Sequence, residues 1–358
     1  MGMTSRQRIE AAFNHKEPDR TPIFEYVLLS PLADKLIGRP YAGDLANWQA
    51  IVREKGWEGA LRQNAIDRLE IACLLGHDML YATPNPLPPA PEEKVEPPAG
   101  NLSEDPVERM RERNGRKASS PLSPPDKSLL IYVYLKEEMG RRSLDLPILA
   151  PAYEHGVWTD TDLMQTMLLA PDVAEEHFSL ATQSAARRIE KYISLGIDQI
   201  GIGGDLAGNR PLISPQAYRD FIVPEVRLLS RSIHGAGRWA INASDGDLWS
   251  VIDDFLVGCQ VDGYLEIDVH AGMDMRRLKA SYGDRVTLYG NLDCGNILSL
   301  GSQEDVRRHT IECLEAGWGS GGHILCASNA ITASVPFRNY LAVVDAYRDM
   351  FGLPKLYL

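Results

Sequence analysis

Carboxylate and imidazole side chains alternate along one short apolar segment of the sequence. In GYLEIDVH, Glu266, Asp268 and His270 are spaced two residues apart, which would place all three on the same face of a strand. Carboxylate oxygen and imidazole nitrogen are suitable ligands for zinc or another divalent cation. The spacing therefore permits a metal site formed by these three residues. Because the same pattern also arises by chance on strands, a purely structural role stays the alternative.

Other polar residues stand where apolar runs end. Asp205 follows the run IDQIGIGG, and Asn242 follows RWAI. Carboxyl groups that meet in one cavity raise each other's pKa, and a carboxyl with a raised pKa can act as a general acid. We therefore expect Asp205, Asn242 and Asp268 to be the catalytic residues. The alternative for each is that it only bonds a loop amide.

Eight strand-like runs alternate with helical patterns and would position these residues. The expected strands cover residues 22–26, 78–81, 147–152, 198–204, 238–243, 263–268, 286–291 and 323–327. Polar residues before a strand-to-helix loop are typical of a (β/α)8 barrel, which keeps its chemistry at the carboxyl ends of its strands. We therefore predict one TIM barrel domain over residues 1–358. A doubly wound open sheet is the alternative, but no GxGxxG or P-loop motif supports it.

The expected substrate-binding residues lie at or near the ends of these strands, where they would line the barrel mouth. They are Glu25, Tyr26, Tyr153, His155, Asn291 and Asn329.

A proline-rich segment follows the second expected strand. Residues 83–125 hold nearly half of the chain's 23 prolines, a density that disfavours regular structure over most of the segment. We interpret it as an excursion from a single barrel, because the strand–helix alternation resumes unchanged after it. A linker between two domains is the alternative. Residues 129–138 are expected to add a strand or hairpin outside the main sheet.

Composition limits the class of protein and its partners. With 44% hydrophobic residues and a formal net charge of -12, the chain is an ordinary globular protein with neither nucleic acid nor anionic membrane as its expected partner. Its five cysteines are odd in number and scattered, which indicates reduced thiols. No signal core and no run of about 18 apolar residues occur. We expect a soluble cytoplasmic protein.

Several longer motifs resemble a known superfamily. PDRTP near the start, GGD followed by PLISPQAYRDFIVPEV, AGMDMRRLKASYGDRVTLYGNLD and GGHILCASNAI are similar to the uroporphyrinogen decarboxylase-like barrels. The resemblance is specific after residue 140 and weaker before it. It implies a single (β/α)8 barrel and one of two activities, uroporphyrinogen decarboxylation or cobamide-dependent methyl transfer.

Departures from the motifs of that superfamily separate its branches. The decarboxylases carry arginines after the first strand that hold the substrate's carboxylates, whereas this chain has FEYVLLSPLADKLIG with Glu25 and no arginine. Their histidine after the last strand corresponds to Asn329. The zinc-dependent thiol methyltransferases carry His-x-Cys at the fifth strand, and this chain has Asn242 and Ser244 there. Neither uroporphyrinogen decarboxylation nor zinc-dependent methylation of a thiol is therefore favoured, and a cysteine-ligated zinc is not expected.

The remaining implication is a corrinoid-dependent methyltransferase. Its substrate would be a small methoxylated aromatic, and its acceptor would be cobalamin or a related corrinoid carried by a corrinoid-binding partner protein. The leaving phenolate would need a general acid or a Lewis acid such as zinc. Transfer from a methylcorrinoid to another acceptor, a tetrapyrrole or small-acid decarboxylase, and a binding barrel of the same superfamily stay open. A homodimer also stays open.

Overall fold

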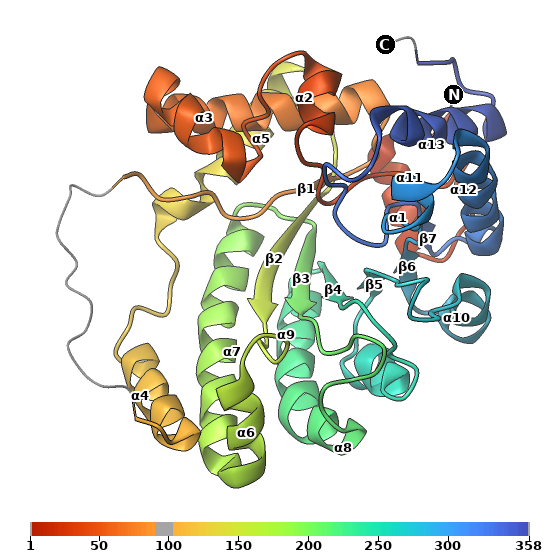
Figure 1. Cartoon of the computed structure of the whole chain (residues 1–358). Helices are drawn as coiled ribbons and strands as arrows, with labels where there is room; N and C mark the ends of the chain where they lie inside the picture. The colour runs from red at the N-terminus through yellow and green to blue at the C-terminus, as the bar shows by residue number, and fades with distance from the viewer. Residues whose placement is uncertain (1, 90–102, 357–358) are drawn as a thin grey trace.

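The computed structural model describes residues 2–89 and 103–356 of the 358-residue chain. Seven parallel strands follow one another in chain order and curl into a barrel wall (Figure 1). Their bounds are β1 Leu80–Tyr81, β2 Ile148–Glu154, β3 Gln199–Gly203, β4 Trp239–Ala243, β5 Gly263–Leu265, β6 Thr287–Tyr289 and β7 His323–Ile324. These positions match seven of the eight predicted strands, although several strands are shorter than predicted.

The eighth predicted strand, residues 22–26, closes the barrel without forming a regular strand. On one side, Phe24 N donates to Leu325 O at 3.1 Å, and Leu325 N donates to Pro22 O at 2.8 Å. On the other side, Asp78 N donates to Ile23 O at 2.8 Å. Proline has no N–H to extend a ladder, which limits the pairing here. The predicted (β/α)8 barrel is confirmed, with this segment between β7 and β1.

Helices surround the sheet on its outer face (Figure 1). They begin where the sequence supplies caps: Thr4 accepts from Gln7 N at the start of the first helix, and Gln7 bonds Thr4 N in return. The bounds are α1 Ser5–Phe13, α2 Leu32–Ile37, α3 Leu45–Leu75, α4 Pro106–Ala118, α5 Leu130–Arg141, α6 Thr161–Leu169, α7 Pro171–Ser194, α8 Pro215–Ala217, α9 Val223–Gly235, α10 Met275–Tyr282, α11 Ile297–Leu300, α12 Gln303–Gly317 and α13 Phe337–Met350. A short 3-10 helix, η1 Asp126–Leu129, and two π-helical segments, η2 Tyr218–Ile222 and η3 Asp254–Gly258, complete the set.

The excursion between β1 and β2 is more helical than predicted. Asp105 caps the helix α4 by accepting from Val107 N, and Pro106 occupies the first helical position, where a missing N–H costs nothing. The expected strand or hairpin at residues 129–138 is wrong, because these residues start the helix α5 and bury Ile131, Tyr132 and Leu135. Part of the proline-rich stretch, residues 90–102, lies outside the described residues.

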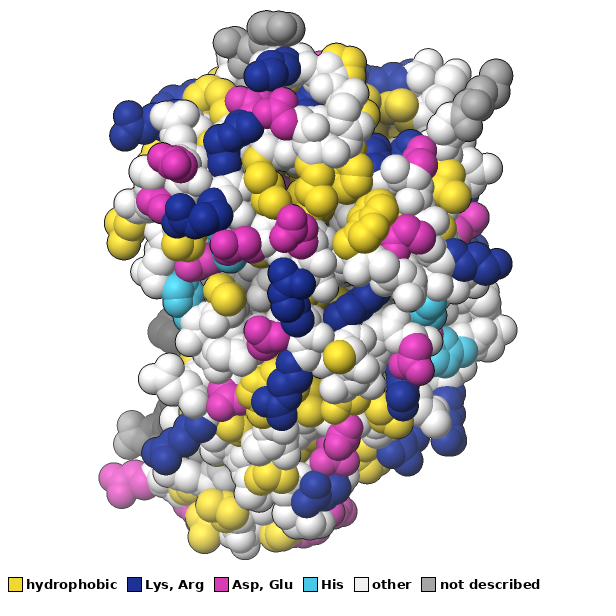
Figure 2. Space-filling model, turned by 90° about the vertical axis from the view of Figure 1, so that its right-hand side faces the viewer, with side chains coloured by type: hydrophobic (Ala, Val, Ile, Leu, Met, Phe, Trp, Pro, Cys, Tyr) yellow, Lys and Arg dark blue, Asp and Glu magenta, His cyan; other side chains and the backbone are white. Residues whose placement is uncertain are grey.

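The five cysteines are all free, and only Cys73 is exposed. On the side that lies to the right in Figure 1, basic and acidic side chains are intermixed with small apolar areas (Figure 2). Within the described ranges, no helix combines the length and the apolar character needed to cross a membrane.

Candidate active site

The carboxyl ends of the strands surround a cavity of about 230 Å³. In Figure 1 the arrows of β2 and β3 point toward this end of the barrel, where α6 and α8 lie. Alternate residues of the strands turn their side chains inward, so the walls are mainly apolar and aromatic. The lining consists of Tyr26, Tyr81, Leu149, Pro151, Tyr153, Glu154, Gly201, Ile202, Gly203, Gly204, Asp205, Ile241, Ala243, Leu265 and Glu266.

Two glycines bring Asp205 to this cavity. A Cβ on Gly203 would lie 1.9 Å from the side-chain oxygen of Asn242, and a Cβ on Gly204 would lie 2.8 Å from Glu154 Cγ. Gly204 also has φ +128°, a conformation that other residues rarely adopt. The Gly-Gly-Asp sequence therefore lets the end of β3 pack closely between β2 and β4.

Carboxyl groups from three strand ends bond the loops of neighbouring strands. Asp205 Oδ1 accepts from Asp245 N at 3.1 Å, and Asp268 Oδ2 accepts from Gly246 N at 3.3 Å. Asn329 Nδ2 donates to Asp245 Oδ2. Tyr26, Asp205, Asp268 and Asn329 are thus brought together at the mouth, as predicted from their positions at strand ends. Their loop bonds show that the structural alternative also holds for Asp205 and Asp268.

Asp245 is the most perturbed carboxyl of this group. Burial, together with the charges of Glu266, Asp205 and Asp268, raises its pKa to about 8, and the hydrogen bond from Asn329 offsets only part of this effect. The expected raising of pKa among converging carboxyl groups is therefore found at a residue that was not among the predicted catalytic residues. The sequence holds one signal for Asp245: it lies two residues after Ala243, which lines the cavity, and residues two apart on a strand share a face.

Glu266 is the second perturbed carboxyl. Burial raises its pKa to about 7, and the charges of Asp205 and Glu154 act in the same direction. Tyr26 OH donates to Glu266 Oε1 at 2.7 Å, which favours the charged form. Both carboxyl groups can consequently hold a proton near neutral pH; Glu266 lines the cavity, and Asp245 lies beside it through its hydrogen bond to Asp205.

The predicted metal ligands do not converge. Glu266 has φ +73°, so β5 ends at Leu265 and the alternation that would align Glu266, Asp268 and His270 stops there. Asp268 Oδ1 instead accepts from His270 N at 2.9 Å, and His270 Nε2 bonds Asp293 Oδ1 at 2.6 Å. Within the described part of the chain, no group of three or more His, Cys, Asp or Glu residues is arranged to hold a metal ion. These residues therefore do not fit zinc.

Asn242 and Asn291 point away from the cavity, contrary to the prediction. Asn242 is fully buried, and its Nδ2 donates to Phe255 O in the outer layer at 3.1 Å. Because Ile241 and Ala243 line the cavity, alternation turns Asn242 outward. Asn291 Nδ2 lies 3.4 Å from Met273 O, and its side chain borders a separate outer pocket. The structure gives both asparagines packing roles.

Tyr153, near the end of β2, and His155, just after β2, were also predicted to bind substrate. Tyr153 borders the cavity, but burial raises the pKa of its phenol, and its neighbours Thr182 and Glu225 lie on α7 and α9. A register shift between Pro151 and Tyr153 accompanies this orientation. His155 is buried, with its pKa lowered to about 4 by burial, and Val157 N donates to its Nδ1 at 3.3 Å. Both contact the site through packing.

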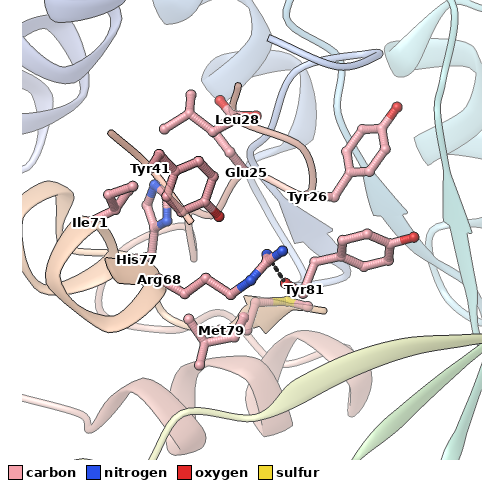
Figure 3. A pocket seen from close by; sticks show the side chains of 10 residues that line it. Glu25, Tyr26, Leu28, Tyr41, Arg68, Ile71, His77, Met79 and Tyr81 are labelled. Carbon is pink, nitrogen blue, oxygen red and sulfur yellow. Dashed lines mark hydrogen bonds between the residues drawn. The ribbon is translucent and has the colours of Figure 1, made fainter. Parts of the chain in front are cut away.

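Glu25 faces a second, smaller cavity of about 30 Å³ beside the mouth (Figure 3). Its Oε2 accepts from Ala327 N at 3.1 Å, and burial raises its pKa to about 8. Tyr26 and Tyr81 line both cavities, so they form the wall between them. Glu25 is therefore placed behind this wall and not in the main cavity.

Comparison with known proteins places the chain in a family. The model of the family described as uroporphyrinogen decarboxylase (URO-D) matches residues 156–350, more than half of the chain. The chain belongs to the uroporphyrinogen decarboxylase family. Three curated relatives, uroporphyrinogen decarboxylases from strains of Coxiella burnetii, are each 24% identical over 264 residues, which are 68% of this chain and 70% of the relative.

A solved structure extends the likeness to the whole chain. A methyltransferase from Methanosarcina mazei superposes with a TM-score of 0.68 over 98% of this chain and 99% of its own, at 18% sequence identity. At this identity the superposition shows a shared fold. The N-terminal segment and the excursion, which the family model does not cover, thus belong to an architecture that another protein has.

Proposed function

We propose that this member of the uroporphyrinogen decarboxylase family is a methyltransferase that demethylates small aryl methyl ethers. The methyl group would pass to a corrinoid carried by a partner protein. The observation that carries the proposal is the mouth cavity itself, which has apolar and aromatic walls and lies beside Asp245, a carboxyl group whose pKa is raised to about 8. The fold shared with the methyltransferase from Methanosarcina mazei supports it.

Decarboxylation of a porphyrinogen suits this cavity poorly. Among the residues that the structure describes, no lysine, arginine or histidine lines it, and its carboxyl groups would repel a substrate with several carboxylates. Drug-sized ligands occupy pockets of about 300–1,000 Å³. A cavity of about 230 Å³ therefore suits a molecule with one ring better than a tetrapyrrole.

The residues of the mouth would each contribute to release of the phenol, either by protonating the ether oxygen or by positioning the acid or the substrate. Asp245 would donate its proton to the ether oxygen as the methyl group leaves, since an aryl oxide is otherwise a poor leaving group at neutral pH. Asn329, which donates to Asp245 Oδ2, would hold this carboxyl in place. Asp205 and Asp268 would act through Asp245 by maintaining its raised pKa. Tyr26 and Tyr81 would contact the aromatic ring.

The corrinoid must lie outside the cavity, because the cavity is too small for its macrocycle. When bound, it supplies the nucleophilic cobalt that accepts the methyl group. The open carboxyl end of the barrel is the face through which the cobalt could reach a substrate in the cavity. No metal is required at the ether oxygen in this proposal, since Asp245 supplies the acid.

The test is methyl transfer from an aryl methyl ether to free cobalt(I) cobalamin, followed by the visible spectrum of cobalt and by chromatography of the released phenol. We expect loss of the cobalt(I) absorbance and an equal amount of phenol. Absence of transfer with methoxybenzenes of every charge, and with other methyl donors, would contradict the proposal. Phenol release without cobalamin would point to hydrolysis instead.

A further inference from the structure

We propose that the substrate of the mouth cavity carries a positive charge, as an aryl methyl ether with an ammonium group would. This inference rests on the proposed function and specifies its substrate class. A ring that bears a carboxylate is the class that the cavity would reject.

The first observation is negative charge without a counter-ion. Glu154, Asp205 and Glu266 line the cavity, and Asp268 lies beside it; Asp245, which is hydrogen-bonded to Asp205 through its backbone N, holds a proton near neutral pH and adds little charge. None of the five forms a salt bridge with a basic side chain in the described ranges, although 28 such pairs occur elsewhere. Charges of this kind in a partly enclosed site attract a cation strongly, because the low dielectric weakens screening.

The second observation is the position of the neighbouring basic residue. Arg68 lines the smaller cavity behind the tyrosine wall (Figure 3). Its Nε donates to Asn64 Oδ1 at 2.7 Å, and its Nη1 donates to Tyr81 O at 2.8 Å. It therefore stabilises the wall, and it does not line the mouth cavity, where a substrate carboxylate would need it.

The third observation is the aromatic wall itself. The rings of Tyr26 and Tyr81 meet edge to face, with centroids 5.7 Å apart and an interplanar angle of 85°. Tyrosine faces attract ammonium groups, and this attraction adds to that of nearby carboxylates. The wall and the carboxyl groups line the same cavity, so an aromatic cation could use both.

The experiment compares three ligands of nearly equal size and shape. Calorimetry without corrinoid would measure the binding of 4-methoxybenzylamine, 4-methoxybenzyl alcohol and 4-methoxybenzoate to the full chain at pH 7. We expect the amine to bind roughly tenfold or more tightly than the alcohol, and the benzoate more weakly still, as expected for close charges at an intermediate dielectric. The preference should shrink as salt is added.

Two variants connect the preference to the cavity. Glu154→Gln and Asp205→Asn should each reduce the ratio of amine to alcohol binding several-fold, roughly the effect of removing one nearby charge. Glu315→Gln, an exposed carboxylate beside Trp318 and Met350, is the matched control and should leave the ratio unchanged. If a variant fails to fold, the salt dependence of the parent protein still decides the question.

Equal binding of amine and alcohol, or tighter binding of the benzoate, would overturn the charge assignment. Transfer of methyl from the neutral ether to cobalamin with no preference for the amine would overturn it as well, while the proposed methyltransferase activity would stand. Preferential binding of the amine without methyl transfer from any ether would support the charge assignment and contradict the proposed activity.

Discussion

Carboxyl groups at the amino ends of the strands and carboxyl groups of the mouth cavity have opposite kinds of partner. At the amino ends of the strands, the buried Asp78 lies 2.7 Å from Arg20 and 3.2 Å from Arg8. Asp198, which precedes β3, lies 2.7 Å from Arg6. At the carboxyl ends, the carboxyl groups of the mouth have backbone amides, Tyr26 and Asn329 as partners, and no basic side chain in the described ranges.

This difference separates structural from chemical use of the same residue type. A carboxylate beside arginine connects segments: Asp78, just before β1, accepts from Ile23 N and so joins residues 22–26 to β1. A carboxyl group that is buried among like charges instead retains a proton, as Asp245 does. The mouth cavity, whose carboxyl groups have no arginine partner in the described ranges, is thus less favourable for folding and more useful for catalysis.

The largest effect should come from breaking a pair at the amino end. Asp78→Ala leaves Arg8 and Arg20 without their shared buried carboxylate, and removal of one partner of a buried pair typically costs about 3–5 kcal/mol. Urea unfolding would measure the loss. Asp349→Asn, which breaks the exposed pair with Arg307, is the control and should cost far less, because water screens exposed ion pairs. Equal losses would contradict the structural assignment.

Asp245→Asn should act on the reaction and not on folding. Loss of the proton donor should slow methyl transfer about a hundredfold. Because the folded pKa of Asp245 is raised to about 8, its ionisation opposes folding increasingly as the pH rises from near 4 toward 8. The asparagine variant should therefore be at least as stable as the parent at pH 7. If Asp245→Asn instead lost much of its stability and kept its rate, Asp245 would have a structural role like that of Asp78, and the comparison would be wrong.

Asp205→Asn and Asp268→Asn should change the pH profile of the reaction. Each removes one charge that raises the pKa of Asp245, so this pKa should fall by roughly one unit. The parent rate should decline as the pH rises through about 8, and both variants should decline at lower pH. At pH 8 we expect rates roughly fivefold below the parent, because about half of the parent and about a tenth of each variant would hold the proton. An unchanged profile would show that these residues only bond loops.

The smallest catalytic effect is expected at Asn242. Asn242→Ala removes the buried hydrogen bond to Phe255 O, a loss worth about 1–3 kcal/mol in stability. The rate of methyl transfer by the folded protein should remain close to that of the parent, because the side chain points away from the cavity. A hundredfold slower rate at full stability would return Asn242 to the mechanism.

The sequence predicted the fold better than it predicted the site. Alternating apolar runs and helix caps were sufficient for the barrel, since both are local patterns. The direction of a side chain at a strand end depends on where the strand stops, and β5 stops at Leu265 because Glu266 has a positive φ. In β4, WAINA contains apolar residues on both faces, so alternation could not show that Asn242 points outward. The role of Asp245 depends on groups from three other strand ends, which only the folded structure brings together.

The most direct test of the central claim is the pKa of Asp245 in the folded protein. Infrared difference spectra of the parent and of Asp245→Asn, recorded from pH 5 to pH 10, would isolate its carboxyl band from those of Glu25 and Glu266. We predict that a protonated carboxyl belonging to Asp245 is present at pH 7 and ionises near pH 8. Ionisation near pH 4, the ordinary range for aspartate, would contradict the account.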